Sequence, residues 1–384
     1  LIYGEMLMRK SFIVPMSVAM ALMSVTAVSA AQEPAEQPQY GIVSDYEMVG
    51  ASESATYGQF KYEKVYNKPE VIITGLTDSA AANSDIHLFI PDKIDGYTVT
   101  EIKDSAFKDN VNIKSVTFSE GLKEIGAAAF SGCVNLTGTV TLPSTLTLLD
   151  YNWSNNGGAF SGTSISKVVF KDGNDKLTIG RCSFSNCKAL TEVSLPSNIS
   201  IISPYTFDGD NSLEKVTFKD GAYELTVDDN SFRNTSVKNV IFPKNTIKIG
   251  AGAFNNDVEL TGITLNDGLK TIGSGAFMSC NNLGGKLVIP STVETIGSRY
   301  NNGAFEGTSL TSIEFKDSKT GTLISIYDNT FKDCKLLERV SLPNRVQDID
   351  ANAFENDTNL ASVEFKEVVA NLTIGGSAFY NTAI

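Results

Sequence analysis

The residues best suited to catalysis are few in this chain, and only one of them is a histidine. His87 lies in the segment "DIHLFIP". A Ser-His-Asp or Cys-His arrangement could be centred only there, and a metal site built from several histidines is impossible because no second histidine exists. A lone histidine in a strand-like segment more often has a structural role. We therefore predict no catalytic residue.

Four of the five cysteines occupy one position of a recurring phrase, three residues after a phenylalanine, and they are Cys133, Cys187, Cys280 and Cys334. Successive members of this row lie at least two repeats apart, about 10 Å at a strand spacing of ~5 Å, which is too far for a disulfide. We interpret the row as architectural. Cys182 stands outside it, and the sequence leaves open a local bridge, an exposed thiol, or an ordinary core or surface cysteine.

Sequence motifs for phosphate, metal or nucleophile chemistry are missing. The glycine pairs in "IGAGAF" and "IGSGAF" lack the third glycine and the strand-to-helix context of a phosphate-binding loop. No P-loop, Gly-x-Ser-x-Gly elbow, His-Glu-x-x-His or calcium-binding nonapeptide pattern occurs. Carboxylates are so abundant that suggestive pairs arise by chance. We predict no enzyme activity, no cofactor and no metal site.

The chain is organised by a phrase that recurs from residue 102 to the end and reads roughly I-G-x-x-A-F-x-x-C/N/D/T-x-x-L-x-x-V-x-F/L. Its twelve phenylalanine anchors are spaced by 22 to 30 residues, which matches the period of a leucine-rich repeat and is too short for a pair of helices. The spacing predicts a mainly β, right-handed solenoid of about 12 coils. The anchors are Phe107, Phe130, Phe160, Phe184, Phe207, Phe232, Phe254, Phe277, Phe305, Phe331, Phe354 and Phe379.

Other positions of the phrase also have a physical role. An aliphatic residue lies five residues before most anchors, and a phenylalanine or aliphatic residue lies ten to twelve residues after them. We expect both to point inward and to stack on their counterparts in neighbouring coils. The Val-x-Phe pattern at the second position predicts one short strand per coil, paired in parallel with the strands of the coils on either side.

A longer period is superimposed on the first. Five anchors recur 147 residues later, and Phe160 recurs after 145 residues as Phe305. Two long coils, "LPSTLTLLDYNWSNNGGAFSGTS" and "IPSTVETIGSRYNNGAFEGTS", lie at matching places, so we infer that a six-coil block was duplicated. Ile384 aligns with Val237 in the middle of a coil, so we expect that the last coil is truncated and that the natural protein continues.

The part of the chain ahead of the repeats in residues 102–384 divides into three segments. Residues 1–30 contain two basic residues, an apolar run and the small-residue pattern Val28-Ser29-Ala30, which predict a signal peptide; an uncleaved membrane anchor is the alternative. Residues 31–56 are predicted to be a flexible leader by composition. Residues 57–101 are related to the repeats but irregular, and they predict an amino-terminal cap.

The repeated residues resemble a known family. The unit L-x-x-V-x-L-P-x-x-L-x-x-I-G-x-x-A-F-x-x-C is nearly complete in "LTEVSLPSNISIISPYTFDGD" and "LERVSLPNRVQDIDANAFEND", and it resembles the BspA-like, or Treponema-type, leucine-rich repeat. The resemblance covers about residues 57–384, including the entry segment "FIPDKIDGYTVTEIKDSAF". It implies an exported or surface protein of host-associated bacteria or some protists, where several such proteins are implicated in adhesion to host matrix proteins or to other microbes.

If stacked side chains fill the interior, only the outer surface is available to bind a partner. In each strand the residue between the two inward positions faces out, and stacking places these residues in a long, fairly flat row. The alternative is that β-propensity alone selected them. We predict a binding surface formed by this row and by two long coils around Tyr151–Trp153 and Arg299–Tyr300, because aromatic loop residues suit an interface. Its members are Thr117, Thr141, Trp153, Val169, Ser194, Thr217, Ile241, Thr264, Val288, Tyr300, Glu314, Ser341 and Glu364.

The charge of the chain limits its partners. Without residues 1–30 it has 29 basic and 43 acidic residues, and such a surface repels phosphate backbones, which argues against nucleic acid. No later segment is apolar enough to insert into a membrane. We predict a secreted or cell-surface binding or adhesion module whose partner is a host or microbial surface protein or glycan. A structural spacer that presents a further domain and a cryptic glycan-directed enzyme are the alternatives, and the oligomeric state stays open.

Overall fold

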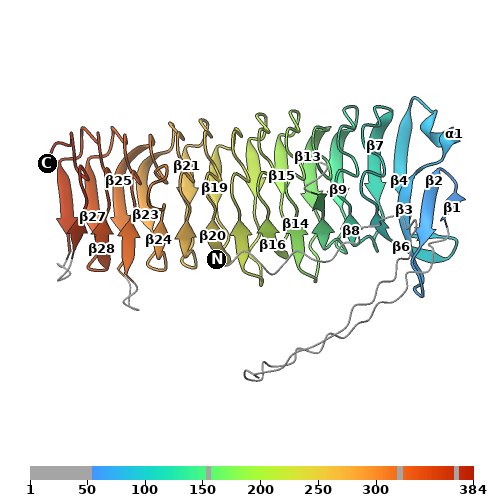
Figure 1. The fold of residues 1–384 in the computed structure, drawn as a ribbon, viewed down its shortest axis with the longest axis horizontal. Helices are drawn as coiled ribbons and strands as arrows, with labels where there is room; N and C mark the ends of the chain where they lie inside the picture. The colour runs from blue at the N-terminus through green and yellow to red at the C-terminus, as the bar shows by residue number, and fades with distance from the viewer. Residues whose placement is uncertain (1–53, 153–156, 318–322, 367–371) are drawn as a thin grey trace, which may run out of the picture. The chain divides into compact units, whose positions relative to one another are not determined.

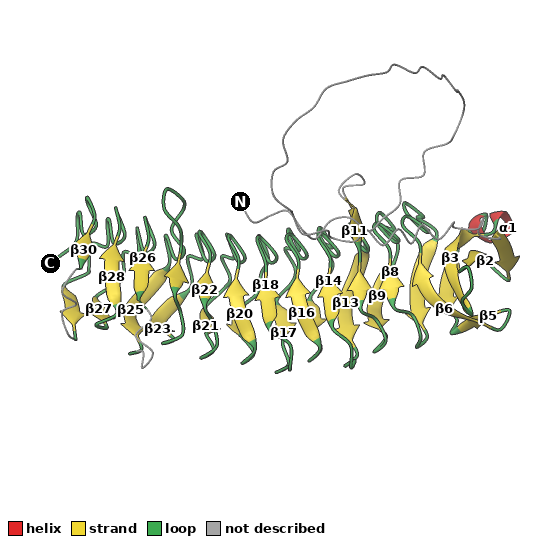
Figure 2. Cartoon of the chain, turned by 60° about the horizontal axis from the view of Figure 1, so that its bottom comes forward, coloured by secondary structure: helices red, strands yellow, loops and turns green. Residues whose placement is uncertain are grey.

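The computed structural model describes residues 54–152, 157–317, 323–366 and 372–384. Within this part of the chain, successive coils lie side by side in chain order (Figure 1), and the regular coils carry two strands each, in the two layers seen in Figure 2. The prediction of a mainly β solenoid of about 12 coils with stacked parallel strands is confirmed. The one helix of the described residues, α1 (Asp78–Ala81), has four residues and lies in the cap.

The first layer is a 16-stranded sheet that runs through every coil. Its strands are β1 (Ser54–Tyr57), β2 (Phe60–Lys64), β3 (Glu70–Leu76), β5 (Lys93–Ile94), β6 (Tyr97–Ile102), β8 (Glu124–Ile125), β10 (Leu148–Leu149), β14 (Leu177–Ile179), β16 (Ile199–Ile202), β18 (Leu225–Val227), β20 (Thr246–Ile249), β22 (Thr271–Ile272), β24 (Thr295–Ile296), β26 (Ile324–Ile326), β28 (Val346–Ile349) and β30 (Thr373–Ile374). The pairings β1–β2, β2–β3 and β5–β6 are antiparallel, and the rest are parallel. The first strand begins at Ser54, three residues before the predicted start of the cap.

The second layer consists of four separate small sheets. They contain β4 (Ile86–Ile90) and β7 (Ile113–Phe118); β9 (Thr137–Leu142), β13 (Ser164–Phe170), β15 (Glu192–Ser194) and β17 (Lys215–Thr217); β19 (Asn239–Ile241) and β21 (Gly262–Thr264); and β23 (Gly284–Ile289), β25 (Ser309–Phe315), β27 (Arg339–Leu342) and β29 (Ser362–Phe365). A hairpin of β11 (Tyr151–Asn152) and β12 (Gly157–Gly158) belongs to the first long coil.

The strand count per coil differs from the expectation. The Val-x-Phe strands form the small sheets, as expected, but the Ile-Gly segments form a second set of strands and make the continuous sheet. Each Ile-Gly strand is only two to four residues long, so it gains regular structure from its neighbours in the stack and not from its own pattern.

A column of phenylalanine rings fills the space between the two layers. Adjacent anchors stack with ring centroids 4.9 to 5.4 Å apart, from Phe107 to Phe379. The backbone N–H of each anchor donates to the carbonyl just before the next anchor at 2.7 to 2.9 Å, for example Phe232 to Ala253. Eleven of the twelve anchors are buried, and Phe379 in the last coil is half-buried.

A few predicted inward positions are less buried than expected. Phe218 and Leu265 are half-buried. At the end of the stack, Phe365 in β29 is 37% exposed and Ile374 in β30 is 54% exposed, because no further described strand pairs beyond them.

Most coils have two corners with a left-handed backbone, two residues before and two residues after the anchor, and the long coils of Phe160 and Phe305 have only the second. Asn234 (φ 58°) and Asn256 (φ 62°) occupy the second corner of their coils, and Gly209 (φ 78°) occupies that of another. This conformation costs glycine nothing and asparagine little, which explains why these residues and aspartate recur there.

Alternate coils end their second-layer strand in two different ways. One type continues with a buried proline, at Pro143, Pro196, Pro243, Pro290 and Pro343. In the other type an acidic residue stands near the end of the strand, and in most of these coils a lysine precedes it. The lysine forms an ion pair with the acidic residue of the coil two positions earlier, across the intervening proline coil. The pairs are Lys171–Glu120 (2.8 Å), Lys219–Asp172 (2.5 Å), Lys316–Asp267 (2.9 Å) and Lys366–Asp317 (3.4 Å). These groups are well exposed, so each pair contributes little to stability.

Candidate functional site

The predicted row of outward side chains is aligned by strand pairing. Thr117 pairs with Phe89 of the cap, and Ile241 pairs with Thr264. Two longer runs are held in direct register: Thr141, Val169, Ser194 and Thr217 in one small sheet, and Val288, Glu314, Ser341 and Glu364 in another. The row therefore follows the small sheets and is interrupted wherever one small sheet gives way to the next.

Exposure varies along this row. Ile241 is 72% exposed, whereas Val169 and Val288 are half-buried. Phe89, which sequence reasoning missed, lies on the same row and is 59% exposed. The signal was available in the alternation of "DIHLFIP", where Phe89 falls between the inward residues Leu88 and Ile90.

Paired charges flank the row. The carboxylate of Glu192 forms ion pairs with Lys215 (2.9 Å) and Lys167 (3.0 Å). The two ammonium groups lower the pKa of Glu192. Lys286 pairs with Glu314 of the row itself and lowers the pKa of that carboxyl. Charges on this face are thus largely compensated in pairs.

The second long coil, around Arg299 and Tyr300, does not lie on the row of outward side chains. Tyr300 is 92% exposed and follows β24 of the 16-stranded sheet, and its backbone N–H donates to Asp328 (2.8 Å), just beyond β26. Arg299 pairs with Asp350 at 3.0 Å, just beyond β28. Tyr300 thus stands at the ends of strands of the first layer, whereas the row lies on the second. Trp153 lies outside the described residues, and so do the side-chain contacts of Tyr151.

The single histidine has a serine and an aspartate as neighbours. His87 Nδ1 lies 2.7 Å from Ser115 Oγ, and Nε2 lies 3.6 Å from Asp85 Oδ1, which is too long for a hydrogen bond. The His87 and Asp85 side chains are 63% and 70% exposed. A nucleophilic serine needs an oriented base in a water-excluded site. The open face of β4 does not provide such a site.

A buried row of small polar side chains runs beneath the corner after the anchors. Cys187 Sγ donates to the Phe160 carbonyl (3.2 Å), and the Cys187 N–H donates to Asp210 Oδ1 (2.7 Å). In the second half of the chain, Cys334 makes the same two contacts, with the Phe305 carbonyl (3.2 Å) and with Asp357 Oδ1 (2.7 Å). Burial raises the pKa of both thiols, so they are poor nucleophiles in the architectural place that the sequence predicts.

Three aspartates of this row are fully buried. Asp257 accepts the N–H and the hydroxyl of Thr235 at 2.6 and 3.0 Å. Burial raises the pKa of Asp210 and Asp257, and it raises the pKa of Asp357 to about 9. The second oxygens of Asp210 and Asp357 have no hydrogen-bond partner among the described residues. The carboxyl of Asp357 is therefore neutral at pH 7, and burial favours the neutral form of Asp210 and Asp257 as well.

Cys182 is a free thiol, which leaves no local bridge to Cys187. It occupies the left-handed corner two residues before Phe184, with φ 55°, and is half-buried. Burial raises the pKa of this thiol as well. Its position outside the row follows from the corner, where glycine, asparagine and serine stand in other coils.

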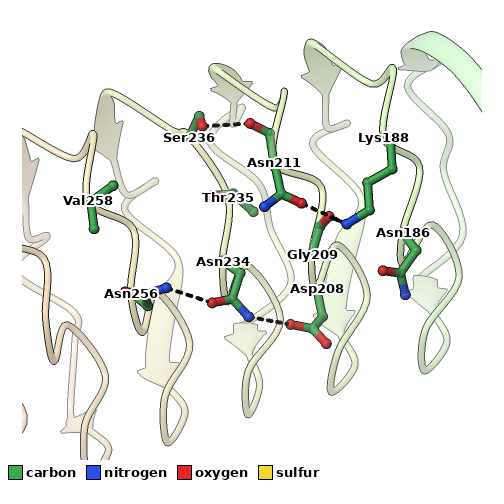
Figure 3. Close-up of a pocket in the computed structure, with 10 residues that line it drawn as sticks. All are labelled: Asn186, Lys188, Asp208, Gly209, Asn211, Asn234, Thr235, Ser236, Asn256 and Val258. Carbon is green, nitrogen blue, oxygen red and sulfur yellow. Dashed lines mark hydrogen bonds between the residues drawn. The ribbon is translucent and has the colours of Figure 1, made fainter.

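A polar groove of about 350 Å³ opens over the second corner of four successive coils (Figure 3). Lys188 donates to the Gly209 carbonyl (2.5 Å) and to Asn211 Oδ1 (2.7 Å), and Asn256 donates to Asn234 Oδ1 (2.9 Å). Sequence reasoning missed this groove, since its parts are far apart in the chain. It is lined by Asn186, Lys188, Asp208, Gly209, Asn211, Asn234, Thr235, Ser236, Asn256 and Val258.

The described residues contain no helix long and apolar enough to cross a membrane. They also contain no group of three or more His, Cys, Asp or Glu side chains placed to hold a metal ion.

The stacked coils define a leucine-rich-repeat solenoid. The family model described as BspA type leucine rich repeat region matches in six copies, over residues 100–226, 154–284, 225–301 and 285–384. The chain belongs to this family, as the resemblance implied. A search of curated proteins finds no match.

Solved structures of bacterial leucine-rich-repeat proteins are similar to this chain. A leucine-rich repeat protein from Bacteroides ovatus ATCC 8483 is 21% identical with a TM-score of 0.50, and the match covers 85% of this chain and 92% of that one. A leucine rich cell surface protein from Faecalibacterium prausnitzii A2-165 is 20% identical with a TM-score of 0.43, covering 83% and 96%. The first likeness supports the fold alone.

Proposed function

We propose that this chain is a non-enzymatic extracellular binding or adhesion module that engages a host or microbial surface protein or glycan through the outside of the solenoid. The proposal rests on the division of each coil into inward side chains, which form the core, and outward side chains, which form the surface. Stacked rings and aliphatic side chains fill the inside, and the outward side chains of the second layer stand in register over successive coils. Repeat solenoids use such extended surfaces for binding, and the family assignment agrees with this role.

Binding is tested with labelled protein on a panel of host and microbial surface proteins and glycans. The double variant Thr217→Lys/Ile241→Lys places two charges on the row, and we expect it to weaken binding to the partner found by about tenfold or more, because an exposed apolar contact is replaced by a solvated ammonium group. The matched control is Thr226→Lys/Thr271→Lys, on the outward face of the 16-stranded sheet. Equal effects of the two pairs would reject the row as the binding surface, and a chain that binds nothing would favour the spacer.

We also propose that the protein is exported to the cell surface or the medium by residues 1–30. The basic start, apolar run and small-residue pattern at Val28-Ser29-Ala30 support this. Mass spectrometry of the protein released by the producing cell should then find an amino terminus at Ala31. Detection of the intact first thirty residues on the mature protein would contradict cleavage and favour the membrane anchor.

A further inference from the structure

The polar groove exists because one corner has no side chain. A Cβ atom at Gly209 would lie 3.0 Å from Asn186 Oδ1 and 3.5 Å from Lys188 Nζ. Any larger side chain at this position would extend into the space between Asn186 and Asn234, the corner residues on either side (Figure 3). Gly209 thus keeps the middle of the groove open.

The matching corner in the second half of the chain is filled. Asn356 stands 147 residues after Gly209, and its Nδ2 donates to Asp333 Oδ1 (3.3 Å), the counterpart of Asn186. Asn381, the counterpart of Asn234, donates to Asn356 Oδ1 (3.0 Å). The same surface therefore carries a continuous row of bonded side chains in one half and an open groove in the other.

The open groove presents neutral hydrogen-bonding groups and one ammonium group. Asn186, Asn211, Asn234 and Asn256 contribute carboxamides, which both donate and accept hydrogen bonds. The carboxamide of Asn186 makes no hydrogen bond to another described residue, and it is exposed. Polar groups of this kind along a groove match a ligand that is itself rich in donors and acceptors.

Of the two charged groups that line the groove, Asp208 is paired with an opposite charge, whereas Lys188 contacts neutral oxygen atoms. Both carboxylate oxygens of Asp208 are held by Arg233, at 2.8 and 2.9 Å. Lys188 instead donates to a backbone carbonyl and to an amide oxygen, which are neutral. The groove of this acidic chain, with a net charge of −13, thus offers a cation that a ligand carboxylate can reach.

We propose that this groove binds a short oligosaccharide that carries a carboxylate, namely a uronic-acid-containing chain. The sugar hydroxyls, each a donor and an acceptor, bond to the corner carboxamides, and a uronate carboxylate pairs with Lys188. The ligand lies along the stack, across the coils of Asn186, Gly209, Asn234 and Asn256. This inference rests on the proposed binding function and names one site and one ligand class for it.

The test is isothermal titration calorimetry of the full chain with two hexasaccharides, hexagalacturonate from plant pectin and a hyaluronan fragment, each as free acid and as methyl ester. We expect at least one free acid to bind about tenfold or more tightly than its ester, because esterification removes the charge that Lys188 recognises. The acid that binds more tightly identifies the source. Failure of both acids to bind would overturn the proposal, and so would equal binding of acid and ester.

Two variants tie the binding to the groove. Gly209→Asn closes it as Asn356 does, at a corner where Asn356 itself holds φ 63°, so folding is retained. Lys188→Gln removes the ammonium group. We expect each to weaken binding of the free acid by about tenfold or more, and we expect Lys188→Gln to bind acid and ester alike. The control is Lys335→Gln, the counterpart of Lys188 beside the filled corner, which should bind as the unaltered chain does.

The outcomes separate this inference from the proposed function. If hexasaccharide binding is absent, or is unchanged in Gly209→Asn and Lys188→Gln, while the chain still attaches to its surface partner, the groove assignment alone is wrong. If neither hexasaccharides nor any surface partner bind, the proposed function is wrong as well.

Discussion

Replacing Phe232 with alanine is expected to lower the free energy of unfolding by about 3 to 5 kcal/mol, the cost of emptying a buried aromatic site. Phe232 is fully buried and stacks at 5.0 Å on Phe207 and at 5.0 Å on Phe254. The interior side chains of each coil pack mainly against those of its two neighbours, so this loss also weakens the coupling between the coils on the two sides. Urea denaturation followed by circular dichroism should show an earlier and less steep transition.

The control for this prediction is Phe89→Ala. Phe89 is 59% exposed on the second layer, so its removal should change the free energy of unfolding by less than about 1 kcal/mol. Equal losses for the two variants would mean that the stacked column does not carry the stability of the solenoid.

Raising the pH from 5 to 8 is expected to destabilise the folded chain, and Asp357→Asn should remove part of this dependence. Burial raises the pKa of Asp357 to about 9 from an ordinary value of 3.8, and it raises the pKa of Asp210 and Asp257 in the same direction. Between pH 3.8 and about pH 9, the carboxyl of Asp357 keeps a proton in the folded chain that it has released in the unfolded chain. For Asp357 the stabilisation is complete below about pH 4 and is lost as the pH rises toward 9, by up to ~1.4 kcal/mol per pH unit.

The other described groups whose pKa values are shifted act outside this pH range. Lysines lower the pKa of Glu120 and Asp172, so the stability of those pairs is lost only below about pH 4.5. The thiols act near and above their ordinary pKa of 9.0. Among the described groups whose pKa values are shifted, the buried aspartates are therefore the ones that the pH range 5 to 8 reports on.

Thermal melts across this range measure the effect. The carboxamide introduced by Asp357→Asn would keep the acceptor for the Cys334 N–H but could not ionise, so the melting temperature of this variant should fall less with pH than that of the unaltered chain. Glu259→Gln, at an exposed position, should leave the slope unchanged. An Asp357→Asn slope equal to that of the unaltered chain would show that Asp357 ionises freely in the fold.

The stacked interior could be predicted from the sequence because burial leaves a periodic record. Phe130 and Phe254 recur in a phrase whose spacing sets the coil length, and the aliphatic residue five places earlier, as at Ile125 and Ile249, follows from the same phrase. The row from Thr141 to Thr217 also follows, since a residue between two inward positions must face out.

The continuous sheet could not be predicted in the same way. Thr271–Ile272 forms a strand of two residues, too short to show an alternating pattern, and its regularity comes from pairing with coils about 24 residues away. The left-handed corner at Cys182 was equally hidden, because a cysteine carries no signal for that backbone.

The groove escaped prediction for a different reason. Gly209 looks like any corner glycine in the sequence, and its effect depends on Asn186 and Asn234, which stacking brings beside it. Only the pair Gly209 and Asn356, read as counterparts across the duplication, could have drawn attention to it. A binding site made by an absent side chain leaves no motif.

The alternation of proline-ended and lysine-bearing coils limits how such an array can change in length. Lys171 reaches Glu120 over the coil of Pro143, and Lys316 reaches Asp267 over that of Pro290. Insertion or deletion of one coil would put two coils of the same type next to each other and leave a lysine facing a proline turn. Growth by pairs of coils avoids this fault, and the six coils inferred for the duplicated block are an even number. Genes of this kind should therefore differ in length by whole pairs of repeats.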